Sequence, residues 1–220
     1  MPSVKPNISL IPIGRAKLEA LLEVPDGAKG LVLFAHGSGS SRRSPRNAYV
    51  ARVVREAGIG TLLFDLLTED EASDRGNVFD IDFLAARLKA ATDWVRNIGS
   101  AQGLGIGYFG ASTGAAAALV AAADDQTIGA IVSRGGRPDL AGPALPKVKA
   151  PTLLIVGGDD TEVIELNEEA YERLTCKKEL RIVAGATHLF EEPGTLEEVA
   201  RLARDWFKLH LRKSVTERRR

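Results

Sequence analysis

The chain has 220 residues, of which 45% are hydrophobic and 26% are charged, and its 29 basic and 29 acidic side chains cancel. This composition predicts one soluble globular domain with a large core, and the charge balance argues against a nucleic-acid or membrane partner. The sequence shows no signal peptide and no apolar run that could span a bilayer, and the lone Cys176 excludes an internal disulfide, so we expect a cytoplasmic protein.

The chain begins with two extended segments, 8–13 and 17–24, which predict an antiparallel hairpin. After this hairpin, short runs rich in Val, Ile and Leu alternate with longer helical patterns. Strands are expected at 30–35, 60–66, 104–109, 128–133, 152–156 and 179–183, and helices at 47–57, 79–98, 112–123, 163–174 and 196–211. The alternation is typical of an α/β fold in which helices cover both faces of a mostly parallel, eight-stranded sheet.

The sequence contains no repeat, long linker or change of composition that would divide it into two domains. We therefore expect a single domain over residues 1–212, followed by a basic, disordered tail at 213–220. The acidic, polar segment 68–82 is the one candidate for a small lid. Its polarity predicts a surface loop, so no large lid is expected.

The segment Gly110-Ala111-Ser112-Thr113-Gly114 lies between a predicted buried strand and an alanine-rich helix. A serine on such a turn, with a glycine two residues away on each side, is typical of a nucleophile elbow. The glycines allow strained backbone angles, and the N-terminus of the helix directs free N–H groups toward a developing anion. Ser112 is therefore predicted to be a nucleophile.

A serine hydroxyl needs a base to remove its proton, and the chain has three histidines. His36 and His188 follow predicted strands, so both are expected at the carboxyl edge of the sheet together with Ser112. His210 falls late in the last helix, where a surface role is expected. The chain order of serine, acid and histidine in α/β-hydrolases selects His188 as the base.

The acid that orients this imidazole should follow a strand between the serine and the histidine. Asp159 and Asp160 are adjacent carboxylates at the end of the strand expected at 152–156. Adjacent side chains point in different directions, so only one of them can accept from the imidazole. We predict Asp160 for this role, with Asp159 as the alternative.

The residues His36-Gly37-Ser38-Gly39 follow the third predicted strand, where α/β-hydrolases place an oxyanion-hole donor. The backbone N–H groups of Thr113 and Ser38, with Gly37 as the alternative to Ser38, are predicted to form the oxyanion hole. His36 is expected to brace this loop beside the substrate.

Five arginines lie on the two loops expected to frame the serine: Arg42, Arg43, Arg46, Arg134 and Arg137. Solvated surface charge is the simpler interpretation of each one. Together they raise the hypothesis that the substrate carries a carboxylate or phosphate group. Arg134 is the strongest candidate, because it directly follows a strand and precedes a Gly-Gly pair, and Arg43 is a second candidate.

Taken together, the motifs resemble those of α/β-hydrolases of the dienelactone-hydrolase-like group. The resemblance covers nearly the whole chain and is carried by residues 36–46, 64–67, 110–114, 157–160 and 185–188. It implies hydrolysis of a small ester or lactone by a nucleophile–His–Asp triad through an acyl-enzyme, without a metal or organic cofactor. Dienelactone hydrolases proper carry cysteine at the elbow, whereas position 112 is serine, so a general carboxylesterase or lactonase is expected.

Two other classes of protein stay open at this point. Gly105-Ile-Gly107-Tyr-Phe-Gly110 matches a dinucleotide-binding pattern, but two of its glycines fall inside a strand and no acidic residue ends the next strand. A non-catalytic binding protein on the same fold is the other alternative, although the complete set of serine, histidine and aspartate argues against it.

The spacing of the histidines does not indicate a metal site. The oligomeric state, a homodimer included, is left open.

Overall fold

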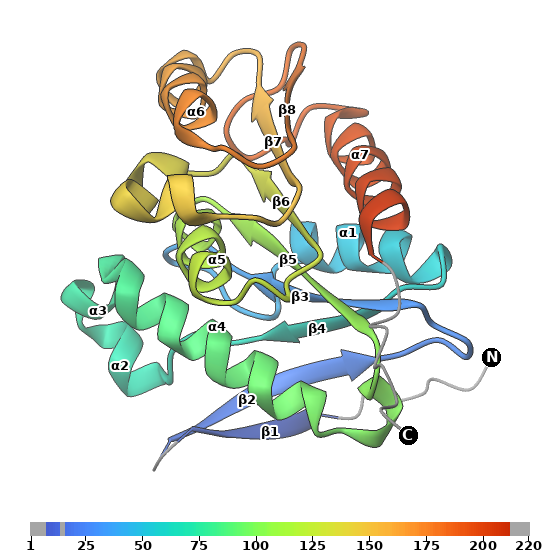
Figure 1. Cartoon of the computed structure of the whole chain (residues 1–220). Helices are drawn as coiled ribbons and strands as arrows, with labels where there is room; N and C mark the ends of the chain where they lie inside the picture. Colours follow the sequence, from blue (N-terminus) through green and yellow to red (C-terminus); the bar gives the residue numbers. More distant parts are fainter. Residues whose placement is uncertain (1–7, 14–15, 212–220) are drawn as a thin grey trace.

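The computed structural model describes residues 8–13 and 16–211, and these contain one eight-stranded sheet (Figure 1). In spatial order its strands are β1 (Ile8–Ile13), β2 (Ala16–Glu23), β4 (Gly60–Phe64), β3 (Gly30–Ala35), β5 (Gly105–Ala111), β6 (Ala130–Arg134), β7 (Thr152–Gly157) and β8 (Lys178–Val183). β2 pairs antiparallel with both β1 and β4, and all other pairs are parallel. The predicted fold class and N-terminal hairpin are confirmed. The expected tail at 213–220 lies outside the described residues.

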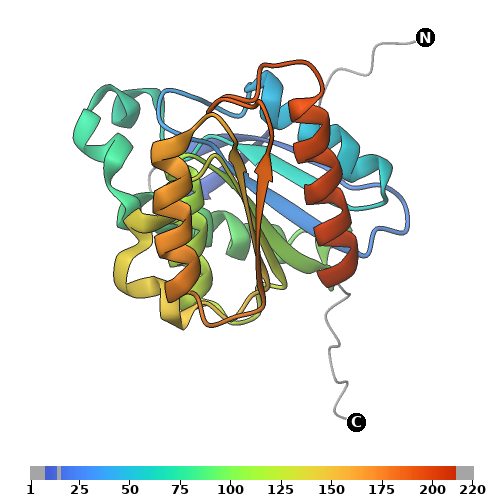
Figure 2. The ribbon, with the colours of Figure 1, turned by 90° about the horizontal axis from the view of Figure 1, so that it is seen from above.

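Helices cover both faces of the sheet (Figures 1 and 2). α1 (Pro45–Glu56) and α7 (Thr195–His210) pack on one face, and α4 (Ile81–Arg96), α5 (Thr113–Asp124) and α6 (Thr161–Arg173) pack on the other. Ile131 and Val132 are neighbours in β6, yet they belong to the two separate apolar clusters. Successive side chains of a strand point to opposite faces, so buried strands such as β6 supply both cores at once.

The helix boundaries differ from the expected ones by a few residues, for local reasons. α1 begins at Pro45 because the Ser44 hydroxyl accepts from the Asn47 N–H, which caps the helix. The connection expected over 135–150 contains a run of 3₁₀ turns, η2 (Pro138–Lys147), and a shorter one, η1 (Gly99–Ala101), precedes β5.

The segment expected to be a surface loop contains two short helices, α2 (Glu69–Ser73) and α3 (Arg75–Phe79). Thr68 and Glu71 form a capping box: each side chain accepts from the other residue's backbone N–H. Glu71 also pairs with Arg87 of α4, which holds the segment against the body of the domain. Helical structure was therefore missed here, although a capping-box pattern stands in the sequence.

Gly110, the last glycine of the dinucleotide-like pattern, allows close packing. A Cβ at Gly110 would lie 2.4 Å from the Cα of Ala115, so the absence of a side chain lets α5 rest directly on β5. At the other end of the elbow, a Cβ at Gly114 would lie 2.2 Å from the Ala35 carbonyl oxygen of β3. These contacts fix the start of α5 at the carboxyl edge of the sheet.

None of the helices within residues 8–13 and 16–211 has the length and apolarity that a membrane crossing needs.

Candidate active site

Ser112 occupies the turn between β5 and α5. Its backbone angles, φ 50° and ψ −123°, are seldom adopted by residues other than glycine. Two main-chain hydrogen bonds hold the turn: the Ser112 N–H donates to the Arg134 carbonyl (3.3 Å), and the Arg137 N–H donates to the Ser112 carbonyl (3.1 Å). Backbone strain persists only where the surrounding structure imposes it, and it concentrates at functional sites. The turn has the geometry expected of a nucleophile elbow.

His188 lies on the loop after β8, and its Nδ1 is 2.7 Å from Oδ2 of Asp160, which follows β7. The histidine side chain is 39% exposed and the aspartate side chain 15%, so the acid is sheltered behind the imidazole. Asp159 is exposed, and its N–H donates to the Ala186 carbonyl (2.9 Å). Of the two adjacent carboxylates, the structure brings Asp160 to the imidazole.

Gly135 connects the serine turn with the histidine loop. It has a φ of +49°, and a Cβ at this position would lie 3.0 Å from the His188 carbonyl oxygen and 3.6 Å from its ring Cε1. Gly135 also directly follows Arg134, whose carbonyl accepts from the Ser112 N–H. Ser112 and His188 therefore flank the same short turn, whose positive φ and close contacts favour a residue without a side chain.

The loop after β3 lies on the opposite side of the serine. A Cβ at Gly37 would be 2.9 Å from the Cβ of Ser112, so the loop backbone reaches the serine itself. The Ser38 N–H donates to the Thr113 hydroxyl (3.1 Å), so this predicted oxyanion donor already has a partner. Gly37, the stated alternative to Ser38, is therefore the loop residue that the structure brings to the serine.

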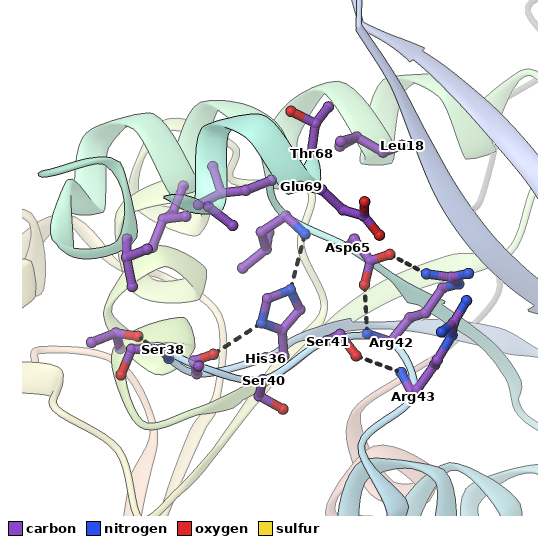
Figure 3. A pocket seen from close by; sticks show the side chains of 18 of the residues that line it. Leu18, His36, Ser38, Ser40, Ser41, Arg42, Arg43, Asp65, Thr68 and Glu69 are labelled. Atoms are coloured by element: carbon purple, nitrogen blue, oxygen red, sulfur yellow. Dashed lines mark hydrogen bonds and ion pairs between the residues drawn. The ribbon is translucent and has the colours of Figure 1, made fainter. Parts of the chain in front are cut away.

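His36 holds this loop through both ring nitrogens (Figure 3). Its Nε2 accepts from the Leu66 N–H (3.1 Å), so the ring proton sits on Nδ1 and is donated to the Gly37 carbonyl (3.0 Å). Burial lowers the pKa of His36 below its ordinary 6.5, and the Gly37 hydrogen bond and the charge of Asp65 offset this only in part. A neutral, doubly hydrogen-bonded imidazole is suited to bracing the loop.

A second attachment of the loop is an ion pair between Arg42 and Asp65. Asp65 accepts from the Arg42 N–H (2.7 Å) and also pairs with the Arg42 guanidinium. The same guanidinium pairs with Glu19 of β2, and the arginine side chain is only 7% exposed. The loop that carries Gly37 is thus fastened to the segment after β4 at two points, through His36 to Leu66 and through Arg42 to Asp65.

A cavity of about 780 Å³ opens beside this loop (Figure 3). Gly37, Ser38 and Thr113 line it on the side of the serine, although Ser112 and His188 themselves do not, and it extends to α2, α3 and β2. Its volume is in the range of small-molecule sites. This cavity could not be predicted from the sequence, because its walls come from segments far apart in the chain.

The five predicted arginines have different surroundings. Three are ion-paired: Arg42 with Glu19 and Asp65, Arg46 with Glu191, and Arg137 with Asp139. Arg43 is exposed and lines the cavity. Arg134 is 7% exposed, its guanidinium lies 5.9 Å from the centre of the Phe190 ring, and its Nε and Nη1 have no hydrogen-bond partner among the described residues.

The remaining candidates for chemistry lie apart from this site. His210 packs on Trp206 of α7, with ring centres 4.4 Å apart. Cys176 is half-buried next to the Thr152 hydroxyl of β7. Within the described part of the chain, no three His, Cys, Asp or Glu side chains come together as metal ligands would.

Comparison with known proteins gives one family and a set of related folds. The model of the dienelactone hydrolase family matches residues 55–211. Two Mycobacterium tuberculosis proteins (strains CDC 1551 and H37Rv), each named "Putative phosphoribosyl transferase", are 61% identical over 191 residues. This match covers 86% of the present chain but 43% of each relative, so the chain spans less than half the length of these curated relatives.

Among solved structures, a dienelactone hydrolase from Anabaena variabilis is 57% identical, with a TM-score of 0.90 over 94% of this chain and 98% of that one. Est1E from Butyrivibrio proteoclasticus is 18% identical, with a TM-score of 0.77 over 92% and 97% of the two chains. An α/β serine hydrolase homologue from Coxiella burnetii is 20% identical, with a TM-score of 0.77 over 93% and 99%. The last two share the fold.

Proposed function

This chain belongs to the dienelactone hydrolase family of α/β-hydrolases, and we propose that it cleaves a small carboxylic ester or lactone with a Ser112–His188–Asp160 triad. The observation that carries the proposal is the 2.7 Å contact between His188 Nδ1 and Asp160 Oδ2, on a loop that Gly135 connects to the strained turn of Ser112. An aspartate at Nδ1 leaves Nε2 of the imidazole free to act as a base. The substrate is a small molecule, and no cofactor enters the reaction.

In the acylation step, the Ser112 oxygen attacks the ester carbonyl and His188 takes the hydroxyl proton. The negative charge that forms on the carbonyl oxygen is stabilised by the N–H groups of Thr113 and Gly37. The imidazolium then gives its proton to the departing alcohol oxygen as the tetrahedral intermediate collapses to an acyl-enzyme. Asp160 stabilises the imidazolium while this charge is present.

Deacylation repeats these steps with water as the nucleophile. His188 takes a proton from the water, the hydroxide adds to the acyl carbonyl, and the proton returns to the Ser112 oxygen as the acid leaves. A lactone follows the same two steps, except that its alcohol stays joined to the acyl group.

The phosphoribosyl transfer in the relatives' name is not extended to this chain, which spans 43% of their length.

The test is hydrolysis of 4-nitrophenyl butyrate together with covalent labelling by a fluorophosphonate. Wild-type protein should turn over the ester and be labelled at Ser112, and Ser112→Ala should lose both, with kcat lowered by about 10⁴–10⁶ if the three residues act as a unit. Ser100→Ala, at an exposed serine of η1, is the control and should change neither. An active Ser112→Ala protein would show that the serine is not the nucleophile.

A further inference from the structure

The cavity beside the oxyanion loop has a lining of nearly balanced charge. Four basic and three acidic side chains line it, and Arg42 is held between the carboxylates of Glu19 and Asp65. Because the opposite charges nearly cancel, a charged ligand gains little from the cavity as a whole. The lining instead offers many hydrogen-bond donors and acceptors close together.

Several of these groups lie together around Arg42 (Figure 3). The loop contributes the hydroxyls of Ser40 and Ser41, β2 contributes the carboxylate of Glu19, and Asp65 directly follows β4. The Glu19 side chain is 46% exposed although it pairs with Arg42, so it can accept further hydrogen bonds. Carboxylates accept and hydroxyls both accept and donate, so this wall complements a neutral ligand with several hydroxyl groups.

The cavity also contains apolar surface. Leu18 of β2 and Val78 and Phe79 of α3 line it beside Thr68, Glu69 and Arg75, and Phe79 is 50% exposed. A carbon chain or ring that bears hydroxyls presents its C–H groups to such a surface while its oxygens meet the polar wall. A plain alkyl group would leave the polar wall without partners, and that loss disfavours it.

We propose that this cavity binds the alcohol portion of the ester, and that this portion is a neutral polyhydroxylated group up to the size of a sugar. The proposal rests on the hydrolase function proposed above, because it concerns the same site. Gly37 and Thr113, whose N–H groups would hold the ester carbonyl, line the cavity, whereas Ser112 and His188 do not. The ester oxygen would therefore stay over Ser112 within reach of His188, and the rest of the alcohol would extend past Gly37 and Thr113 into the cavity.

A matched pair of esters tests this assignment. 1-Monobutyrin and propyl butyrate share the acyl group and a three-carbon alcohol, and they differ by two hydroxyls. We expect kcat/KM to be about tenfold higher for monobutyrin, since sites that hydrogen-bond a substrate hydroxyl discriminate against analogues that lack it. Titration calorimetry of the Ser112→Ala protein with the two intact esters measures the same preference without turnover.

The variant Glu19→Ala removes one acceptor of the polar wall and should reduce the preference for monobutyrin to about threefold or less. Ser40→Ala is the second variant, and it should reduce the preference without touching the ion pair of Arg42. Glu23→Ala is the matched control: Glu23 lies on the same strand and pairs with Arg55, outside the cavity, so the preference should stay at the wild-type value.

Two results would overturn the proposal: equal or reversed kcat/KM for the two esters in the wild type, or an unchanged preference in both cavity variants. Failure of the hydrolase function is a different result, namely no hydrolysis of 4-nitrophenyl butyrate that depends on Ser112. In that event the calorimetric preference of the Ser112→Ala protein still decides whether the cavity recognises the hydroxyl groups.

Discussion

The two sides of Ser112 are built in different ways. On the histidine side the loops meet through backbone contacts that require glycine, as at Gly135 under His188 and at Gly157, where a Cβ would lie 2.3 Å from the Ala186 carbonyl. The oxyanion side also has close glycine contacts, at Gly37 and Gly114, but there the loop is in addition fastened by side chains, His36 to Leu66 and Arg42 to Asp65. Activity should therefore fall sharply when a substitution adds atoms on the histidine side. On the oxyanion side, activity should fall gradually as single contacts are removed.

The largest effect is expected on the histidine side, from the acid of the proposed triad. Asp160→Asn should keep the fold but favour the wrong imidazole tautomer, and kcat for 4-nitrophenyl butyrate should fall by about 10⁴. Asp159→Asn is the matched control, because this exposed neighbour does not touch the imidazole. If Asp159→Asn were the damaging change, the acid would be one residue earlier and the observed contact would be structural.

A glycine substitution tests whether backbone packing positions His188. Gly135→Ala should lower kcat about 100-fold, because the added Cβ, 3.0 Å from the His188 carbonyl, displaces the loop. Gly142→Ala has nearly the same positive φ (46° against 49°) but nothing within 4 Å of the added atom. Both should lose about 1 kcal/mol in urea unfolding, and only Gly135→Ala should lose activity. Equal activity in the two variants would contradict the positioning role.

The oxyanion side should respond more mildly. Asp65→Asn removes the charge that holds Arg42, so the Gly37 N–H is less well fixed and kcat should fall about 30-fold while KM stays nearly constant. Glu23→Gln breaks a comparable carboxylate–arginine pair on β2 and serves as the control. An equal loss in both variants would indicate a general loss of stability, which thermal unfolding of the two proteins would reveal.

Arg134 differs from the other predicted arginines. It is buried, and two of its nitrogens, Nε and Nη1, have no hydrogen-bond partner among the described residues. Burial, with the charge of Arg46 nearby, lowers the pKa of Arg134 to about 10, so it stays charged at neutral pH. The sequence-based hypothesis of an anionic substrate predicts a preference for 4-nitrophenyl hemisuccinate over the butyrate ester. Arg134→Met should narrow that preference about tenfold, whereas the exposed Arg52→Met should leave it intact. Equal kcat/KM values for the two esters in the wild type would reject the hypothesis.

The difference between the two sides also explains which features the sequence could predict. The strands, the elbow at Ser112 and the position of His188 follow from local patterns of apolar residues and glycines, which report on backbone packing. The ion pair of Arg42 with Asp65 joins residues 23 apart in the chain, and neither residue type marks its partner. Only the pattern Thr68-x-x-Glu71 gave a local signal for the missed helix α2.

The smallest predicted effect concerns stability and pH at His36. Its folded-state pKa lies below 6.5, because burial disfavours the charged ring more than the Gly37 hydrogen bond and the charge of Asp65 favour it. As the pH falls below 6.5, the unfolded chain gains a proton that the folded protein resists, so the free energy of unfolding must decrease until the folded pKa is reached. His36→Gln keeps an acceptor for Leu66 but cannot titrate. Urea unfolding at pH 7.5 and pH 5.0 should therefore show a larger loss of stability in the wild type than in His36→Gln. Parallel losses would mean that His36 accepts a proton in the folded state as readily as in the unfolded chain, and the loop would then be held by Arg42 and Asp65 alone.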